Sequence, residues 1–117
     1  MAYAGTPVVH NQLLLLPGDA ATPPQRIRLG TAAWWTWLET AIAFSYRPPH
    51  SLYALTVRNE KRRHGCYWYA YAKIDSKLHN AYLGHAQTLT PERLNQVLHT
   101  LLEKSRQQRT ALTGKGG

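Results

Sequence analysis

The sequence has few of the residues on which several classes of protein depend. It contains one cysteine, Cys66, which excludes an internal disulfide framework and a zinc site built on several cysteines. The longest aliphatic run, Leu13 to Leu16, has four residues, whereas a membrane-spanning helix needs about 20. No Lys or Arg precedes Arg26, so the charged start of a signal peptide is missing. We therefore expect a cytoplasmic protein that does not enter a membrane.

Acidic side chains are also scarce, and their scarcity makes the chain strongly basic. Fourteen Lys and Arg stand against six Asp and Glu in 117 residues, which gives a formal net charge of +8. The excess lies beyond residue 43, because the charges of residues 1–43 cancel. Such a balance predicts an anionic partner, and nucleic acid is the first candidate. Hydrophobic residues make up 44% of the chain, so it can build a core and is not a disordered basic tail.

Patterns suited to catalysis or metal binding are missing from the sequence. No two of the six histidines stand at the i, i+4 spacing of a helical metal site. The chain has no Gly-rich phosphate loop and no Ser-centred elbow, and Cys66 lacks an evident base to activate it. We expect a protein that is not an enzyme and that needs no metal or cofactor.

The chain is short enough for one domain. Its prolines and turn residues predict an irregular segment over residues 1–25, a single domain over 26–108 and a flexible tail over 109–117. Residues 25–29 alternate polar and apolar side chains, which predicts a short strand with Ile27 and Leu29 facing inward.

A short Trp-rich helix is predicted after this strand, over residues 32–43. Thr31 is suited to cap its first turn. The apolar stripe of this helix would consist of Trp34, Trp37, Leu38, Ala41 and Ile42. Trp35 lies outside the stripe, and since Trp is common at interaction hot spots, it is a candidate contact for a protein partner.

A three-stranded antiparallel meander is predicted over residues 51–84, with strands at 51–58, 67–74 and 78–83. Cationic residues 59–65 and residues 75–77 would form its two turns. The middle strand alternates cleanly between two faces. One face carries Tyr67, Tyr69, Tyr71 and Lys73, and the other carries Trp68, Ala70, Ala72 and Ile74.

A C-terminal helix is predicted over residues 91–107, with Thr90 as its cap and Pro91 at its first position. Its apolar stripe is Leu94, Val97, Leu98, Leu101 and Leu102. The small side chains of Ala70 and Ala72 would let this stripe pack closely on the sheet. The expected fold is therefore α+β: an N-terminal strand and short helix, a three-stranded meander, and a C-terminal helix packed on it.

The tyrosine face of the sheet has two possible arrangements. Left open, it is a basic, aromatic platform for nucleic acid, because Arg and Lys bind phosphates and guanine edges. Its candidate contacts are Arg58, Lys61, Arg62, Arg63, Tyr67, Tyr69, Tyr71, Lys73, Lys77, Asn80 and Tyr82. Alternatively, residues 1–46 cover the tyrosines as a second core layer. Residues 61–64 are equally open to two interpretations, a phosphate-binding loop or an ordinary solvated turn.

Several blocks of the sequence match a known small module in order and spacing. The blocks are Gly30 to Leu38, Phe44-Ser45-Tyr46, Tyr67 to Tyr71, and Ala81 to Gly84 followed by Leu89-Thr90 and Arg93-Leu94. Over roughly residues 27–102 the chain resembles the N-terminal module of MalT-like bacterial transcriptional regulators, which also occurs as a standalone protein. More loosely, it resembles the arm-type DNA-binding domains of tyrosine recombinases and the plant AP2 domain. Those domains lay the exposed face of a three-stranded sheet in the DNA major groove.

The expected function is binding of double-stranded DNA through the exposed sheet face, as a regulatory protein at a promoter or an accessory protein of a mobile element. The alternative is a protein-interaction adaptor that docks a larger partner through the sheet face and Trp35, with its charge incidental or serving RNA in a complex. Salt separates the two functions, because only phosphate binding falls steeply as salt rises.

Overall fold

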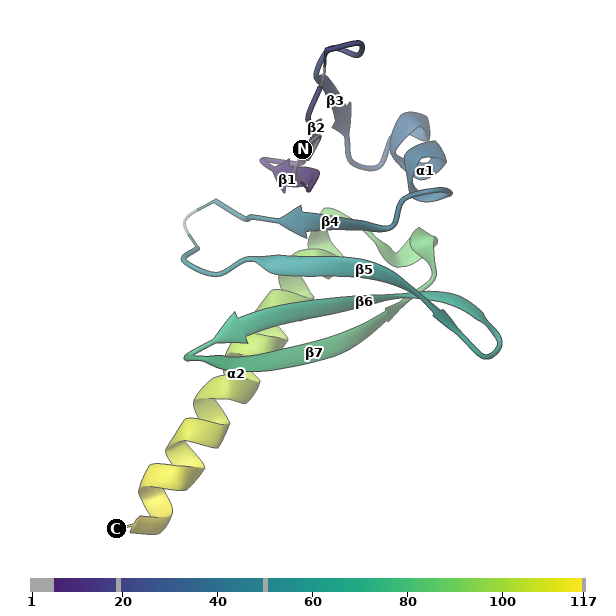
Figure 1. Cartoon of the computed structure of the whole chain (residues 1–117). Helices are drawn as coiled ribbons and strands as arrows, with labels where there is room; N and C mark the ends of the chain where they lie inside the picture. Colours follow the sequence, from purple (N-terminus) through teal and green to yellow (C-terminus); the bar gives the residue numbers. More distant parts are fainter. Residues whose placement is uncertain (1–5, 19, 50, 117) are drawn as a thin grey trace.

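The structure is a computed structural model that describes residues 6–18, 20–49 and 51–116, with side chains described as far as residue 108. Its elements are β1 (Val8–His10), β2 (Leu13–Leu16), β3 (Gln25–Arg28), α1 (Ala32–Leu38), β4 (Ala43–Tyr46), β5 (Leu55–Arg62), β6 (Gly65–Ile74), β7 (Lys77–Gly84), the short 3-10 helix η1 (Ala86–Thr88) and α2 (Pro91–Gly116). The expected α+β class is confirmed (Figure 1).

The described strands form one seven-stranded sheet in the order β3-β2-β1-β4-β5-β6-β7. β1 pairs with β4 in parallel, and every other pair is antiparallel. The predicted meander is present as β5, β6 and β7, and it makes up one half of the sheet (Figure 1). The predicted three-stranded sheet is therefore narrower than the sheet that forms.

The N-terminal segment is the largest departure from expectation. The sequence predicts an irregular segment over residues 1–25, but its described part contains β1 and β2, and β3 begins at Gln25. Asn11 and Gln12 join β1 to β2 with φ values of 54° and 64°, the left-handed pair that a tight hairpin needs and that glycine usually supplies. Val9 and Leu14 are fully buried, so this hairpin belongs to the core.

The Trp-rich helix is shorter than predicted. Thr31 caps it as expected, because its hydroxyl accepts a hydrogen bond from the backbone N–H of Trp34 at 3.4 Å. The helix ends at Leu38 instead of residue 43, and Ile42, expected on its buried stripe, is 73% exposed. The chain leaves the helix to form β4, which places Phe44 in the core.

The first turn of the meander is also shorter than predicted. β5 continues to Arg62, so residues 59–62 lie in the strand, and only Arg63 and His64 connect it to β6. The second turn is confirmed at Asp75 and Ser76, whose φ values of 51° and 68° are typical of a type I′ hairpin.

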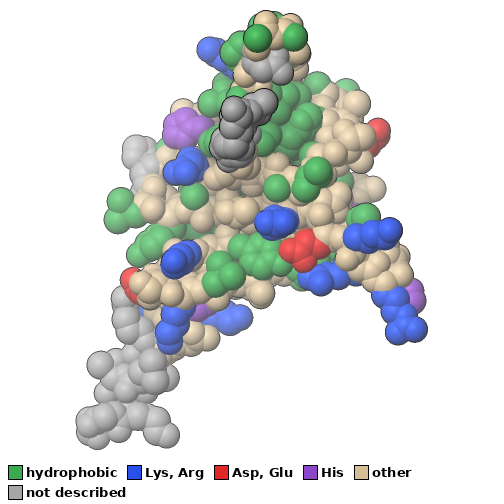
Figure 2. All heavy atoms as spheres, viewed as in Figure 1, with side chains coloured by type: hydrophobic (Ala, Val, Ile, Leu, Met, Phe, Trp, Pro, Cys, Tyr) green, Lys and Arg blue, Asp and Glu red, His purple; other side chains and the backbone are tan. Residues whose placement is uncertain are grey.

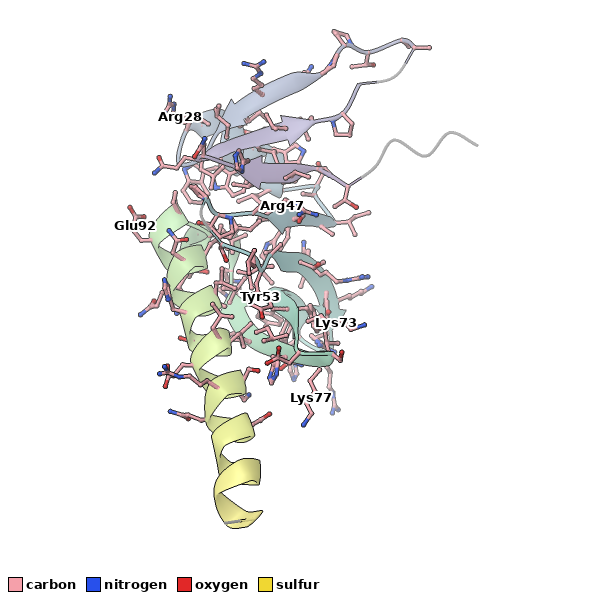
Figure 3. The ribbon with its side chains drawn as sticks, turned by 90° about the vertical axis from the view of Figure 1, so that its left-hand side faces the viewer. Arg28, Arg47, Tyr53, Lys73, Lys77 and Glu92 are labelled. Atoms are coloured by element: carbon pink, nitrogen blue, oxygen red, sulfur yellow. The ribbon has the colours of Figure 1, made fainter. Side chains whose placement is uncertain are left out.

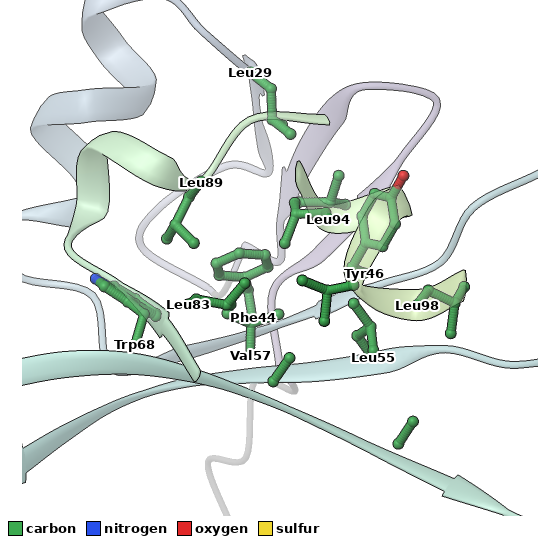
Figure 4. Packing of buried hydrophobic residues seen from close by; sticks show 14 of the residues in the cluster. Leu29, Phe44, Tyr46, Leu55, Val57, Trp68, Leu83, Leu89, Leu94 and Leu98 are labelled. Atoms are coloured by element: carbon green, nitrogen blue, oxygen red, sulfur yellow. The ribbon is translucent and has the colours of Figure 1, made fainter. Parts of the chain in front are cut away.

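The core lies between one face of the sheet and the helices. Leu94, Val97, Leu98 and Leu101 of α2 are buried in one cluster with Trp68, Ala70 and Ala72 of β6. α2 packs on β6 and β7, so the predicted packing of this helix on the meander is confirmed. Thr90 caps α2, since its hydroxyl accepts a hydrogen bond from the Arg93 N–H at 3.2 Å. The ring of Phe44 lies near the centre of the cluster, 5.4 Å from the Trp34 ring and 5.8 Å from the Trp68 ring between centroids (Figure 4).

The helix α2 continues to Gly116, beyond its predicted end near Gln107. Residues 109–116 are therefore helical where the sequence predicts a flexible tail, and the flexibility itself stays a prediction. The helix extends past the end of the sheet in Figure 1. Within the described part of the chain, no helix is both long enough and apolar enough to span a membrane.

Candidate nucleic-acid interface

The two faces of the sheet differ in what covers them. The helices α1 and α2 pack on one face, and none of the described elements lies over the other, which we call the open face (Figures 1 and 3). The alternative that residues 1–46 cover the tyrosines is wrong for the described residues. Those residues continue the sheet sideways as β1 to β4 instead of stacking on it.

A cluster of tyrosines occupies the open face of the meander. Tyr67, Tyr69 and Tyr71 are half-buried by their neighbours, and Lys73 is exposed, while the residues between them are buried under the helices. The alternation predicted for the middle strand is thus confirmed. Tyr82 of β7 is 54% exposed, and its ring centroid lies 5.4 Å from that of Tyr69 and 6.1 Å from that of Tyr67.

The strand register places other predicted contacts beside these rings. Arg58 lies opposite Tyr69, which in turn lies opposite Tyr82, so the three form one row across β5, β6 and β7. Asn80 lies opposite Tyr71 in the neighbouring row. The open face therefore brings together a guanidinium, an amide and several phenols, all groups that bind phosphates or base edges.

Glu60 also lies on this face, and the sequence analysis missed it because it assigned residue 60 to the turn. Its carboxylate accepts a hydrogen bond from the hydroxyl of Tyr71 and lies 2.5 Å from the guanidinium of Arg62. The hydrogen bond to Glu60, with partial burial, raises the pKa of Tyr71 above its ordinary value. The guanidinium carbon of Arg62 also lies 4.6 Å from the centroid of the Tyr69 ring, within reach of a cation–π contact. Arg62 is therefore a partly neutralised cation.

Two predicted contacts belong to the other face. Lys61 lies opposite Cys66 and alternates with Arg62, so its register is that of the helix-covered face, beyond the end of the core. Lys77 lies opposite Ile74, which is buried under the helices, so it too is out of register with the tyrosines. Both lysines remain exposed, and Figure 3 shows Lys77 at the end of the sheet below Lys73.

The hairpin of β5 and β6 projects beyond the rest of the sheet (Figure 1). β4 pairs with β5 as far as Arg58, and the N–H of Asn59 still donates to the carbonyl of Ile42. Among the described strands, residues 60–62 therefore have β6 alone beside them. Lys61, Arg62, Arg63 and His64 are all exposed at this end, which we call the hairpin tip. Arg63 and His64 occupy the turn itself.

The N-terminal half of the open face carries cations that sequence reasoning did not select. Arg26 and Arg28 of β3 lie opposite Leu15 and Leu13. Tyr46 is buried on the helix-covered face, so Arg47, the next residue, lies on the open face. A surface cavity of about 670 Å³ lies between Arg26 and Arg47. The polar–apolar alternation of residues 25–29 can be read from the sequence. Only the pairing of β3 within the sheet shows that Arg26 and Arg28 lie on the open face. Figure 2 shows the basic side chains distributed around hydrophobic surface on this side of the molecule.

Trp35, the predicted contact for a protein partner, is half-buried and packs against the core. Its neighbour Trp34 is fully buried, and the ring of Trp37 stacks on Trp34 at 5.9 Å between centroids. Only part of Trp35 is thus accessible, and its role in a protein contact stays a prediction.

The remaining chemistry of the described residues is sparse. No three His, Cys, Asp or Glu side chains within the described ranges gather closely enough to hold a metal ion. Among known proteins, no family model, no curated protein and no solved structure matches this chain. The resemblance to the MalT-like module therefore stays an expectation, and any assignment of function depends on the open face itself.

Proposed function

We propose that this protein binds double-stranded DNA through the open face of β5, β6 and β7 and through the hairpin tip. The observation that supports the proposal is the open face, where tyrosines lie beside Arg58 and Lys73 with no described element above them. The net charge of +8 provides the long-range attraction to phosphate. The proposed role is that of a regulatory protein at a promoter or an accessory protein of a mobile element.

The dimensions of the sheet limit how DNA can be bound. Seven strands at about 4.8 Å spacing make a sheet about 29 Å wide, whereas the major groove is about 12 Å wide. The whole sheet therefore cannot enter a groove. A two-stranded ribbon does fit, and the projecting hairpin of β5 and β6 is such a ribbon. In the proposed complex the hairpin enters the major groove while the rest of the open face lies along the duplex.

This arrangement divides the side chains by role. Arg63, in the turn, reaches outward to the phosphate backbone, and Lys61 and Arg62 beside it add charge. Arg58 stands at the base of the projecting part, next to Tyr69, where its planar guanidinium can make a bidentate contact to a guanine edge. The tyrosine hydroxyls supply donors for phosphate oxygens, and their rings supply apolar surface for a thymine methyl.

A salt titration tests the proposal. Binding to a labelled random duplex, followed by fluorescence anisotropy, is expected to weaken as salt rises, with a slope of log K against log salt of about −0.9 for each phosphate contact. The Arg58→Ala, Lys73→Ala variant is expected to bind more weakly. Lys104→Ala, on the exposed side of α2, is the control that changes charge away from the open face. Equal affinity of all three proteins, or no duplex binding at all, would contradict the proposal.

A protein adaptor is the second candidate, and the edge strand β7 favours it. β7 has no neighbour on its outer side in the described sheet, and Leu78 there is 67% exposed. An exposed edge strand with apolar side chains can pair with a strand of another protein. A partner bound in this way would resist salt, and Leu78→Lys would disrupt it without weakening duplex binding.

A further inference from the structure

A second set of cations crosses the half of the sheet that lies outside the meander. The strands β1, β3, β4 and β6 run in the same direction. Residues of these strands that lie side by side across the sheet form a row, and the residues two positions later in each strand form the next row on the same face. The first row contains Arg26, Val8, Ser45 and Tyr71 on these four strands. The next row therefore contains Arg28, His10, Arg47 and Lys73, which we call the cationic row.

Contacts and views of the structure agree with this register. Nδ1 of His10 lies 3.1 Å from the carbonyl oxygen of Arg47, which joins the middle of the row across 37 residues of sequence. In Figure 3, Arg28, Arg47 and Lys73 follow one another down the view from β3 to β6, with Arg28 at the end of β3 on the α2 side and Lys73 on the other side. His10, Arg28, Arg47 and Lys73 are all exposed.

The charges of this row are not neutralised by the ion pairs that the structure describes. Those pairs join Glu60 to Arg62 and Glu103 to Arg106, and neither pair includes Arg28, Arg47 or Lys73. The arginine of the meander that does have such a partner, Arg62, lies at the opposite end of the sheet. A line of exposed cations outside these ion pairs favours an extended polyanion over a small ligand with one charge.

The spacing of the row suits the backbone of a duplex. Arg47 and Lys73 are two strands apart, about 10 Å, which equals about three base-pair steps of one DNA strand. Lys73 stands four residues beyond Tyr69, so the row of Arg58 and the cationic row are about 13 Å apart, close to the width of about 12 Å of the major groove. Strands twist by about 20–25° each, so Arg28, three strands from Arg47, is turned by about 60–75° relative to it.

We infer that the cationic row binds the phosphates of one DNA strand, so that the N-terminal strands belong to the interface with the meander. The inference rests on the proposed function, because it concerns the same duplex that the hairpin enters. Arg47 and Lys73 contact phosphates about three base pairs apart on this strand, and Arg28 reaches the same backbone further on. The β1–β3 strands then have two tasks: they extend the core with Val9 and Leu14, and they present cations on the open face.

The test compares two double variants with the same loss of charge. Arg28→Gln, Arg47→Gln removes two members of the row, and Lys104→Gln, Arg106→Gln removes two cations from α2 on the other side of the molecule. Both are titrated with a random duplex at several salt concentrations. We expect the row variant to flatten the salt slope by about 1.8, or about 0.9 for Arg47→Gln alone, and the α2 variant to leave the slope nearly unchanged.

The outcomes separate this inference from the proposed function. If the wild-type protein does not bind duplex, the proposed function fails and this inference with it. If the wild type binds but the two double variants have the same slope, the inference alone is overturned. Arg28→Lys, Arg47→Lys keeps both charges, so a slope restored to the wild-type value supports phosphate contact. A slope that stays flattened in the lysine variant overturns it in favour of a structural role.

Discussion

The two halves of the sheet, the meander β5–β7 and the N-terminal strands, differ in strand length and in how their strands pair. The sequence predicts the first half better than the second. The meander has strands of 8 to 10 residues joined by turns of two residues, so its pairings are local in the chain. The N-terminal strands have three or four residues, and β1 finds its place by pairing in parallel with β4, far along the chain. Short strands of this kind owe their conformation to their neighbours more than to their own pattern.

The halves also present different open faces. The meander offers tyrosines with Arg58 and a glutamate, whereas β1 to β3 offer aliphatic side chains with Arg26 and Arg28. The covered faces, in contrast, form one cluster that runs through both halves, from Leu14 through Phe44 to Trp68. The two halves therefore share one core, while their open faces differ in chemistry.

Loss of Trp68 is expected to have the largest effect on stability. Trp68→Ala removes a ring buried against Phe44 and should cost about 3–5 kcal/mol in the free energy of unfolding. Tyr69→Ala, on the open face of the same strand, should cost far less and weaken DNA binding instead. Chemical denaturation of the two variants measures the contrast. A loss of stability in Tyr69→Ala as large as that in Trp68→Ala would show that the open face is covered.

The N-terminal hairpin can be tested in the same way. Leu14→Ala should cost about 2–5 kcal/mol, because Leu14 is fully buried and pairs with Ile27. Leu15→Ala is the matched control, since the side chain of Leu15 points to the open face and is 39% exposed. A melting temperature that is the same in both variants would mean that residues 13–16 do not belong to the core.

Base recognition should be confined to the meander. Arg58→Ala is expected to cost about 1–3 kcal/mol on a preferred site and much less on random DNA, if Arg58 makes a bidentate base contact. Arg63→Ala should weaken binding to all duplexes alike, because a turn residue reaches only phosphates. Affinities for a selected site and a random duplex, measured at one salt concentration, decide the matter. Equal losses for both variants on both duplexes would leave a purely electrostatic binder.

The smallest expected effect concerns Glu60. Glu60→Gln removes the carboxylate that accepts from Tyr71, so the pKa of Tyr71 should fall back toward its ordinary value of 10.0. Loss of a negative charge on the open face should also strengthen duplex binding, by about 1 kcal/mol or less. Absorbance of tyrosinate during a pH titration follows the first change, and anisotropy follows the second. Weaker duplex binding in the variant would mean that Glu60 itself contacts the DNA.

The hydrogen bond from Tyr71 to Glu60 also determines how the stability of the protein changes with pH. The pKa of Tyr71 is higher in the folded protein than in the unfolded chain, so its hydrogen bond contributes fully below pH 10. That contribution is lost as the pH rises through the raised pKa of Tyr71. Stability of the wild type relative to Glu60→Gln should therefore decline only at alkaline pH, and thermal melts at neutral and alkaline pH would show it.

Much of the meander and of α2 could be predicted because the signals are local. The alternation from Tyr67 to Ile74, the Thr90-Pro91 start of α2 and the turn at Asp75 each depend on neighbouring residues. β1, β2 and β4 could not be predicted in this way. Their turn at Asn11 and Gln12 lacks glycine, and residues 13–16 are all leucine, so no alternation marks which side chains face inward.

The candidate site, like the fold, could be predicted only in part from the sequence. The residues of the open face on β6 follow from a period of two, but Lys77 was placed on the wrong face, since a shift of one residue at a turn exchanges the faces. Lys61 was predicted in the turn, whereas it lies in β5. Glu60 was missed because its strand was predicted to end at residue 58. The cations of β3, and Arg47 just after β4, were missed because they meet Lys73 only through pairings between strands distant in sequence.

The α+β class, the net charge, the caps of both helices and the two faces of the middle strand all follow from local features of the sequence. These depend on composition, on side-chain period and on hydrogen bonds between residues a few positions apart. Only the tertiary structure decided that the N-terminal residues join the sheet instead of covering it, and that Arg28, Arg47 and Lys73 share one row. The physical reason is that strand order and register are set by which strands can bury their apolar sides together, a competition among distant segments that no local pattern records.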